Sequence, residues 1–286
     1  SVNYGANMRL SQIWTYPVKS MVGETVSSCE LNDLGIIGDR IWATRDLERG
    51  GIRGAKKIGG LMQFSAERVD PAQRTVKITA PNGESFFTNE ADSSERLSAL
   101  LGHRVVLEEL PDASNVDHFR RGPSDSDDVL AEMRAVFGRT ADEPLPDFSI
   151  FPPEVMEFES PVGTHHDCYP LMVMTTSALA AMKAAVPNSV VDMKRFRPSL
   201  VVDSGDVDGH PEFQWKNKHV AIGSAVIEIL DPCPRCVMVT RAINNDIPED
   251  RAVLRHIVRD LNQSVGVYAR VLSSGKCSVG DEVRFL

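Results

Sequence analysis

Two cysteines and an arginine lie within four residues, in the segment Asp-Pro-Cys-Pro-Arg-Cys at 231–236. Cys233 and Cys236 offer two thiols, and a thiolate is a soft ligand for transition metals. A neighbouring guanidinium, here that of Arg235, lowers the cost of keeping a thiol ionised. The segment therefore predicts a thiolate that serves as a metal ligand or as a nucleophile.

Three other interpretations of this pair stay open on the residues alone. The cysteines can be structural and buried in a turn at a strand edge. A zinc site needs four ligands, and with no second Cys-x-x-Cys it would have to recruit Cys168, His165 and His166. A redox pair of the thioredoxin kind starts a helix, whereas residues 237–241 are rich in β-forming residues and predict a strand.

Cations and hydroxyls suited to an anion are scattered along the chain. Lys19 and Ser20 end the sequence Tyr-Pro-Val-Lys-Ser, and phosphate oxygens bind such donors well. Arg40 ends the glycine-lined turn Gly-Ile-Ile-Gly-Asp-Arg. Arg197 precedes Pro198, which excludes α-helical backbone at the arginine and places it at the mouth of the apolar strand 200–203.

A hydroxyl-rich turn adds a further candidate. Thr175, Thr176 and Ser177 lie between a predicted strand at 171–174 and a predicted helix at 177–185. Hydroxyls at such a position cap the helix and leave backbone amides that suit an anion. Each of these motifs also has a plainer interpretation, namely a solvated lysine, a structural Asp39–Arg40 pair, a surface charge or simple capping.

Taken in order, these motifs resemble the MOSC domain, named for the C-terminus of molybdenum cofactor sulfurase, together with the N-terminal β-barrel domain that precedes it. The C-terminal run at 266–283 fits as well, and the resemblance spans residues 8–286, weakest across 111–163. It implies a β-rich α+β protein, a MOSC-type β-barrel preceded by an N-terminal β-barrel domain. The expected parts are residues 8–110, an acidic proline-rich crossing segment at 111–163, and a MOSC domain at 164–286.

The resemblance implies a reductase of N-hydroxylated compounds that depends on the molybdenum cofactor (Mo-molybdopterin), like the amidoxime-reducing enzymes. Cys236 matches the cysteine that binds the metal in that family. Matching positions for the rest of the cofactor are Lys19, Ser20, Arg40, Thr175, Thr176, Ser177, Arg197, Ser199 and Arg235. Ser199 replaces an asparagine of the family motif, and Thr176 replaces an acidic residue that some relatives carry.

The family resemblance also sets the expected partners and the alternatives. Electrons would come from a separate electron-donor protein or a flavin reductase, and the substrate would be a small molecule. One alternative is a sulfur carrier that uses a persulfide on Cys236. Another is a non-catalytic protein that binds or delivers the cofactor.

Composition narrows the function classes. Of 286 residues 42% are hydrophobic and 25% charged, as in soluble globular proteins. The net charge of −9 disfavours nucleic acid as a partner. No apolar run reaches 18 residues, so no membrane partner is expected. Residues 1–7 lack the features of a signal peptide, Met8 is the expected natural start, and the odd number of five cysteines indicates reduced thiols in the cytoplasm.

The remaining expectations concern elements. Residues 10–20 and 24–31 predict a hairpin, and residues 95–101, 125–137 (capped by Ser124) and 250–262 predict helices. The end of the crossing segment should return to the site and form one wall of the substrate opening. His166 and Asp167 just beyond it would then relay a proton or, in the plainer interpretation, serve as caps.

Overall fold

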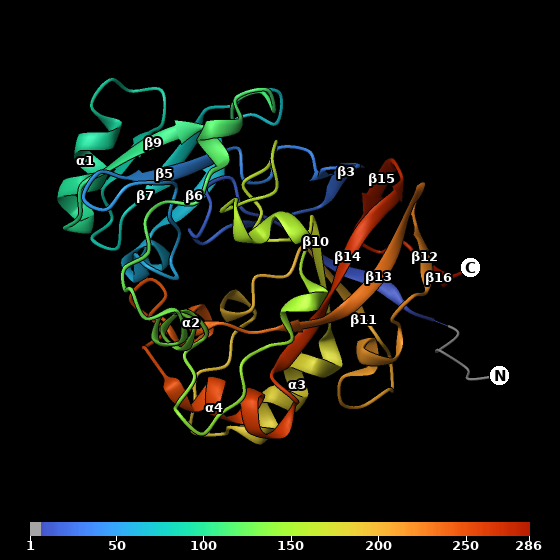
Figure 1. Cartoon of the computed structure of the whole chain (residues 1–286). Helices are drawn as coiled ribbons and strands as arrows, with labels where there is room; N and C mark the ends of the chain where they lie inside the picture. The colour runs from blue at the N-terminus through green and yellow to red at the C-terminus, as the bar shows by residue number, and fades with distance from the viewer. Residues whose placement is uncertain (1–6) are drawn as a thin grey trace.

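The computed structural model describes residues 7–286. In that range the chain forms sixteen β-strands and four α-helices, which confirms the β-rich α+β class. Eight strands build the largest sheet, on the right of Figure 1. In spatial order they are β16 (Val283–Phe285), β12 (His219–Ile222), β13 (Ala225–Pro234), β14 (Ser264–Ser273), β10 (Leu171–Thr175), β11 (Leu200–Asp203), β1 (Arg9–Thr15) and β2 (Glu24–Val26).

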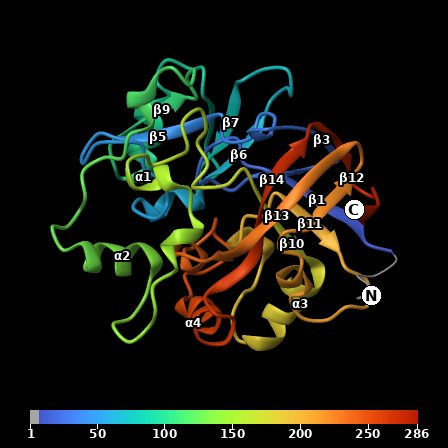
Figure 2. The same ribbon diagram turned by 45° about the vertical axis from the view of Figure 1, so that its right-hand side comes forward.

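Three smaller sheets complete the described strands. The first contains β15 (Gly275–Ser278), β3 (Ser28–Asn32) and β4 (Gly35–Ile36). The second contains β5 (Trp42–Asp46) and β9 (Val105–Glu109). The third contains β6 (Ser65–Arg68), β7 (Val76–Thr79) and β8 (Ser85–Phe87). The second and third sheets lie with helix α1 (Ser93–Leu101) at the upper left of Figure 1, away from the large sheet, and Figure 2 shows the same separation.

The first strands of the chain pair with its last part. β1 and β2 form the predicted hairpin, and β1 also runs antiparallel to β11. β3 pairs with β15, where Cys29 lies opposite Cys277. The sheets therefore do not divide at residue 110, because strands within residues 9–36 pair with strands of the C-terminal half.

The helices begin and end at recognisable caps. The side chain of Asp250 accepts a hydrogen bond from Ala252 N at the start of α4 (Arg251–Asp260). The cap of α2 (Val129–Phe137) is Asp128 rather than Ser124, so the predicted start at 125 was four residues too early. Gly102 ends α1 with a left-handed φ of 71°.

The strand predicted at 237–241 is wrong, because this segment forms the 3₁₀ helix η7 (Val237–Thr240). Its apolar side chains serve two cores rather than one sheet face. Met238 packs into the N-terminal core cluster, and Val239 packs into the cluster around α3 (Thr176–Ala185) and α4. The hydroxyl of Thr240 donates to Val237 O at 2.7 Å and closes the turn.

The described residues hold three hydrophobic clusters. One lies against the large sheet, one fills the N-terminal part, and one packs beneath α3 and α4. Among residues 7–286 there is no helix with the length and apolar character needed to cross a bilayer.

Candidate functional site

Three of the predicted motifs meet at the buried ring of Tyr16. The guanidinium carbons of Arg40 and Arg197 lie 4.5 Å and 4.3 Å from its centroid. The Tyr16 hydroxyl donates to Pro198 O at 2.7 Å, and its backbone N–H donates to Asp39 Oδ1 at 2.7 Å. Asp39 and Arg40 form an ion pair at 2.5 Å. The pair therefore has a structural contact and also lies at the site.

A carboxylate joins two lysines next to this ring. Lys19 Nζ donates to Asp167 Oδ1 at 2.7 Å and to His165 O at 2.9 Å. Lys56 Nζ lies 3.7 Å from the same Asp167 oxygen. We use the name cation cluster for the four side chains gathered here, namely Lys19, Arg40, Lys56 and Arg197.

The charges of the cation cluster act on one another. Burial raises the pKa of Asp167, but Lys19 and Lys56 outweigh it and hold that pKa well below its usual value. Burial together with the nearby Arg40 lowers the pKa of Arg197 to about 10. Four cations therefore face two carboxylates, Asp39 and Asp167, and this excess positive charge suits an anionic ligand.

Cys236 lies beside the cation cluster. It is a free, partly exposed cysteine that precedes η7 and packs against the N-terminal core. Burial lowers the pKa of Lys56, but Asp167 and Cys236 outweigh it and raise that pKa above its ordinary value. The lysine therefore stays protonated next to the cysteine.

Arg235 contacts the other cysteine. Its Nη1 donates to Cys233 Sγ at 3.6 Å and to Val265 O at 3.3 Å, and its Nη2 donates to Phe196 O. The hydrogen bond of Arg235 thus goes to Cys233, and the basic residues on whose pKa Cys236 acts are Lys56 and Arg139. Cys233 near the end of β13 and Arg235 just beyond it lie two residues apart and are both buried, so they turn toward the same interior.

Backbone strain concentrates in the same region. Ser20, Arg40 and Arg197 have left-handed φ values of 72°, 47° and 59°. The other non-glycine residues with positive φ in the described chain are asparagines and a glutamine. Serine and arginine rarely adopt this conformation, and strained residues persist where the surrounding contacts hold them, typically at functional sites.

Two predicted hydroxyls are occupied by the fold. Ser20 Oγ accepts from Ala55 N at 2.8 Å and thereby holds the turn that carries Lys56. Ser199 Oγ accepts from Met172 N at 3.3 Å, between β10 and β11. Ser20 and Ser199 lie next to residues of the cation cluster in sequence or space, but each hydroxyl accepts a hydrogen bond from a backbone N–H.

The structure does not bring the Thr175–Ser177 turn to the cation cluster. β10 and β11 run parallel, with Val173 opposite Leu200. Arg197 precedes β11 while Thr175 ends β10, so they lie at opposite ends of the strand pair, on the order of 15 Å apart at about 3.3 Å per residue. Thr175 Oγ1 donates to Glu212 Oε2 at 2.6 Å. The turn, which includes Thr176, thus caps α3 and anchors Glu212.

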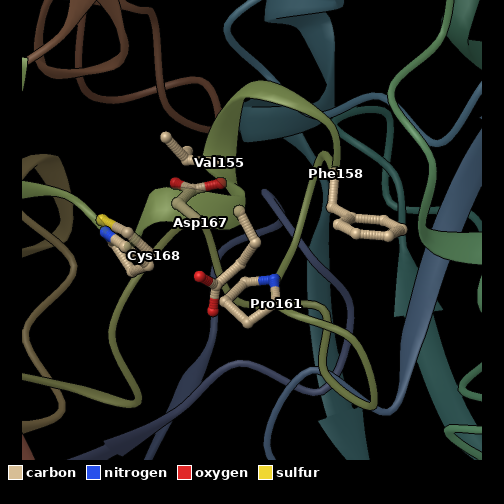
Figure 3. Close-up of a pocket in the computed structure, with 7 residues that line it drawn as sticks. Val155, Phe158, Pro161, Asp167 and Cys168 are labelled. Carbon is tan, nitrogen blue, oxygen red and sulfur yellow. The ribbon is translucent and has the colours of Figure 1, made fainter.

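A narrow pocket opens on Asp167. Its other lining residues are Pro152, Glu154, Val155, Phe158, Pro161 and Cys168. Figure 3 shows Asp167 and Cys168 beside Val155, Phe158 and Pro161. The end of the crossing segment thus forms a wall next to Asp167. His166 has a structural contact instead, since its Nε2 lies 2.8 Å from Leu34 O.

Sequence reasoning missed two members of the site and included one unsupported alternative. Lys56 belongs to no motif, and its only signal is a Lys-Lys pair after Gly54. Tyr16 stands within a quoted motif, but its role as the platform for two arginines depends on strand pairing. For the zinc alternative, no group of three or more His, Cys, Asp or Glu in residues 7–286 is arranged to hold a metal ion.

Comparisons with known proteins cover most of the chain. Residues 161–284 match the MOSC domain, and residues 7–119 match the MOSC N-terminal beta barrel domain. "Mitochondrial amidoxime reducing component 2" of Rattus norvegicus is 24% identical over 96% of this chain and 82% of that protein. The protein of that name from Homo sapiens is 22% identical with the same coverage.

Similar solved structures were also found. The YUAD protein from Bacillus subtilis covers 97% of this chain and 94% of its own, with 9% identity and a TM-score of 0.44. YiiM from Geobacillus stearothermophilus covers 41% of this chain and 54% of its own, with 13% identity and a TM-score of 0.31.

Proposed function

The chain belongs to the proteins that join a MOSC N-terminal beta barrel domain to a MOSC domain, and from this premise we propose that it binds the molybdenum cofactor and reduces N-hydroxylated compounds. The MOSC family is associated with this cofactor. The proposed reaction takes its substrate class from relatives named as amidoxime reducing components, which match over 96% of the chain.

The observation that carries the proposal is a partly exposed thiol next to an excess of positive charge. A pterin phosphate is a dianion, and Lys19, Arg40, Lys56 and Arg197 surround two carboxylates only. Cys236 offers a soft donor for the metal on the same side, facing Lys56. The donor set therefore fits the cofactor, with Cys236 as metal ligand and the cation cluster around the phosphate and pterin.

The bound cofactor would supply the two-electron redox change, while the chain supplies binding and orientation. Lys56 keeps positive charge next to Cys236. Asp167 holds Lys19 and Lys56 in place through one carboxylate oxygen. Val155 and Phe158 keep one side of the opening apolar, while Glu154 and Asp167 offer carboxylate oxygens that can accept hydrogen bonds from the N–H and O–H groups of an amidoxime.

The proposal includes a separate source of electrons and a cytoplasmic setting. The donor would be a redox protein or a flavin reductase that reaches the cofactor from outside. All five cysteines are free thiols, as suits a reducing compartment.

Molybdenum and pterin content of the purified chain tests the proposal directly. Expression in a host that makes the cofactor should give about one molybdenum and one pterin per chain. An amidoxime substrate with an artificial electron donor should then be reduced at a rate proportional to molybdenum content. Cofactor without turnover would favour a delivery protein, and sulfane sulfur on Cys236 without molybdenum would favour a sulfur carrier.

A further inference from the structure

A second cavity, distinct from the pocket at Asp167, lies between α2, α4 and η7. Its volume is about 270 Å³. Figure 1 shows α2 and α4 at the lower left, to the left of the large sheet. We call it the arginine cavity, because four arginines line it: Arg134, Arg139, Arg251 and Arg255.

Positive charge in the arginine cavity is poorly balanced. None of the residues that line it is an aspartate or a glutamate. The carboxylate that pairs with one of the four arginines is that of Glu143, which lies 3.1 Å from Arg255 Nη2. That same carboxylate also pairs with Arg259 Nε at 3.3 Å, outside the cavity. Four cations are therefore opposed by Glu143, which Arg259 shares, and by the more distant Asp142.

Two of the arginines are held in place by backbone. Arg134 Nη1 donates to Thr140 O at 2.8 Å and to Glu143 O at 3.1 Å. Arg139 donates to Pro144 O and to Arg235 O, both at 3.0 Å. Carbonyl partners orient a guanidinium without neutralising it, so these contacts fix positive charge in the wall.

The other two arginines have unused donors. Arg255 Nε is buried and has no hydrogen-bond partner among the described residues. Within residues 7–286 the Arg251 guanidinium makes no hydrogen bond or ion pair, although it stands at the first position of α4, whose N-terminus is positive. A buried donor without a partner costs free energy, and a bound anion would satisfy it.

We propose that the arginine cavity binds the phosphate group of a small phosphorylated metabolite. Guanidinium groups bind phosphate oxygens in pairs of parallel hydrogen bonds, and several arginines around one cavity favour a dianion. The volume lies just below the range of about 300–1,000 Å³ typical of pockets for drug-sized ligands, so a phosphate and a few further atoms fill it. This site is separate from the cation cluster and does not rest on the proposed function.

The arginine cavity lies next to the segment that carries Cys236. Val237 lines the cavity and directly follows Cys236. Arg139 also contacts Arg235 through the backbone oxygen of that residue. A ligand in the arginine cavity would therefore lie against the segment that carries Cys236.

Binding of inorganic phosphate to the purified full chain tests this site, measured by titration calorimetry at constant ionic strength with succinate as a comparison anion. Phosphate should bind more tightly than succinate. R251Q and R255Q should each weaken phosphate binding by about tenfold or more, the loss of one charge-assisted hydrogen bond. R270Q is the control, since Arg270 lies on β14 and pairs with Glu228 away from the cavity, and the phosphate affinity of this variant should stay within about twofold of the unaltered chain.

Loss of phosphate binding can be distinguished from loss of folding. Because the Arg251 guanidinium makes no hydrogen bond or ion pair within residues 7–286, R251Q should fold with an unchanged melting temperature even if R255Q does not. No phosphate binding at tens of millimolar, equal loss in R251Q and R270Q, or tighter binding of succinate than of phosphate would each overturn the assignment.

Discussion

At the scale of single residues, Asp167 organises the proposed cofactor site. Its carboxylate contacts Lys19 directly and lies near Lys56, while its own pKa stays well below the usual value. It therefore carries a negative charge throughout the physiological pH range. A cofactor phosphate that binds the same lysines must share them with this carboxylate, which tunes how tightly the anion is held.

The two cysteines of the Cys-x-Arg-Cys segment should behave differently on substitution. Cys236→Ser removes the partly exposed thiol next to Lys56 and should abolish both reduction and molybdenum retention. Cys233→Ser alters a buried thiol whose pKa is raised by burial, and should leave much of both. Metal analysis and turnover of the two variants check this, and the opposite pattern would move the ligand assignment to Cys233.

Loss of one cation from the cluster should weaken the cofactor site. Lys19→Met removes the charge that binds Asp167 and, in the proposal, the phosphate. We expect about ten- to a hundredfold weaker cofactor retention, since a charge-assisted hydrogen bond contributes roughly 1.5–3 kcal/mol. Pterin content after dialysis measures it. Lys77→Met is the control, since this partly exposed lysine of β7 pairs with Glu67 away from the cation cluster, and the variant should retain the cofactor fully.

Glu212 should make stability depend on pH. It is fully buried, and burial raises the pKa of its carboxyl to about 7 despite the Thr175 hydrogen bond. A raised carboxyl pKa means that the unfolded chain loses the proton first, so the free energy of unfolding falls as pH rises from about 4.5 to 7. The loss is roughly 3 kcal/mol above pH 7.

Glu212→Gln should remove that dependence. Its free energy of unfolding, measured with urea, should approach or exceed that of the unaltered chain as pH rises from 5 to 8. A constant difference between the two proteins across this range would show that Glu212 does not titrate there.

At the scale of elements, the direction of β10 and β11 decides which motifs share a site. Both strands run the same way, so the residues before β11 and those after β10 lie at opposite ends. The tail of the crossing segment, in contrast, returns to the end where β10 begins and contributes a wall beside Asp167. The parallel direction of the two strands thus separates the turn after β10 from Arg197 before β11, although the family motifs place both at the cofactor.

Thr175→Ala tests this division. It removes the N-cap of α3 and the hydroxyl that bonds Glu212, so the free energy of unfolding should fall by about 1–2 kcal/mol. Molybdenum content should not change, because the turn lies far from the cation cluster. Loss of molybdenum from a variant that still folds would place the turn at the cofactor after all.

At the scale of the whole molecule, the two matched family domains share their sheets. β1 lies between β2 and β11, and β3 pairs with β15 near the other end of the chain. Lys19 also donates to the backbone of His165, and Arg241 donates to Ala55 O and Lys56 O. Neither part can keep all of its hydrogen bonds if the other unfolds.

The chain should therefore unfold in one cooperative step. Differential scanning calorimetry should show a single transition whose calorimetric and van't Hoff enthalpies agree. Two separated transitions would show that the N-terminal and C-terminal parts are stable independently.

Local chemistry by itself determined several features of this protein. Asp250 with the apolar spacing of the following residues was enough for α4, and Gly102 for the end of α1, because caps and periodicity act within a few residues. The cations Lys19, Arg40 and Arg197 could likewise be selected from short motifs, since charge and flanking glycine or proline are visible in the sequence.

Only the tertiary structure decided how those residues combine. Lys56 reaches the site because Ser20 holds its turn, and Arg235 contacts Cys233 because both are buried, one near the end of β13 and one just beyond it. Residues 237–240 form η7 because their apolar side chains fill two cores at once. Each outcome depends on contacts between segments tens to hundreds of residues apart, and such contacts override local propensity because burial in a shared core stabilises more than the preference of a single residue.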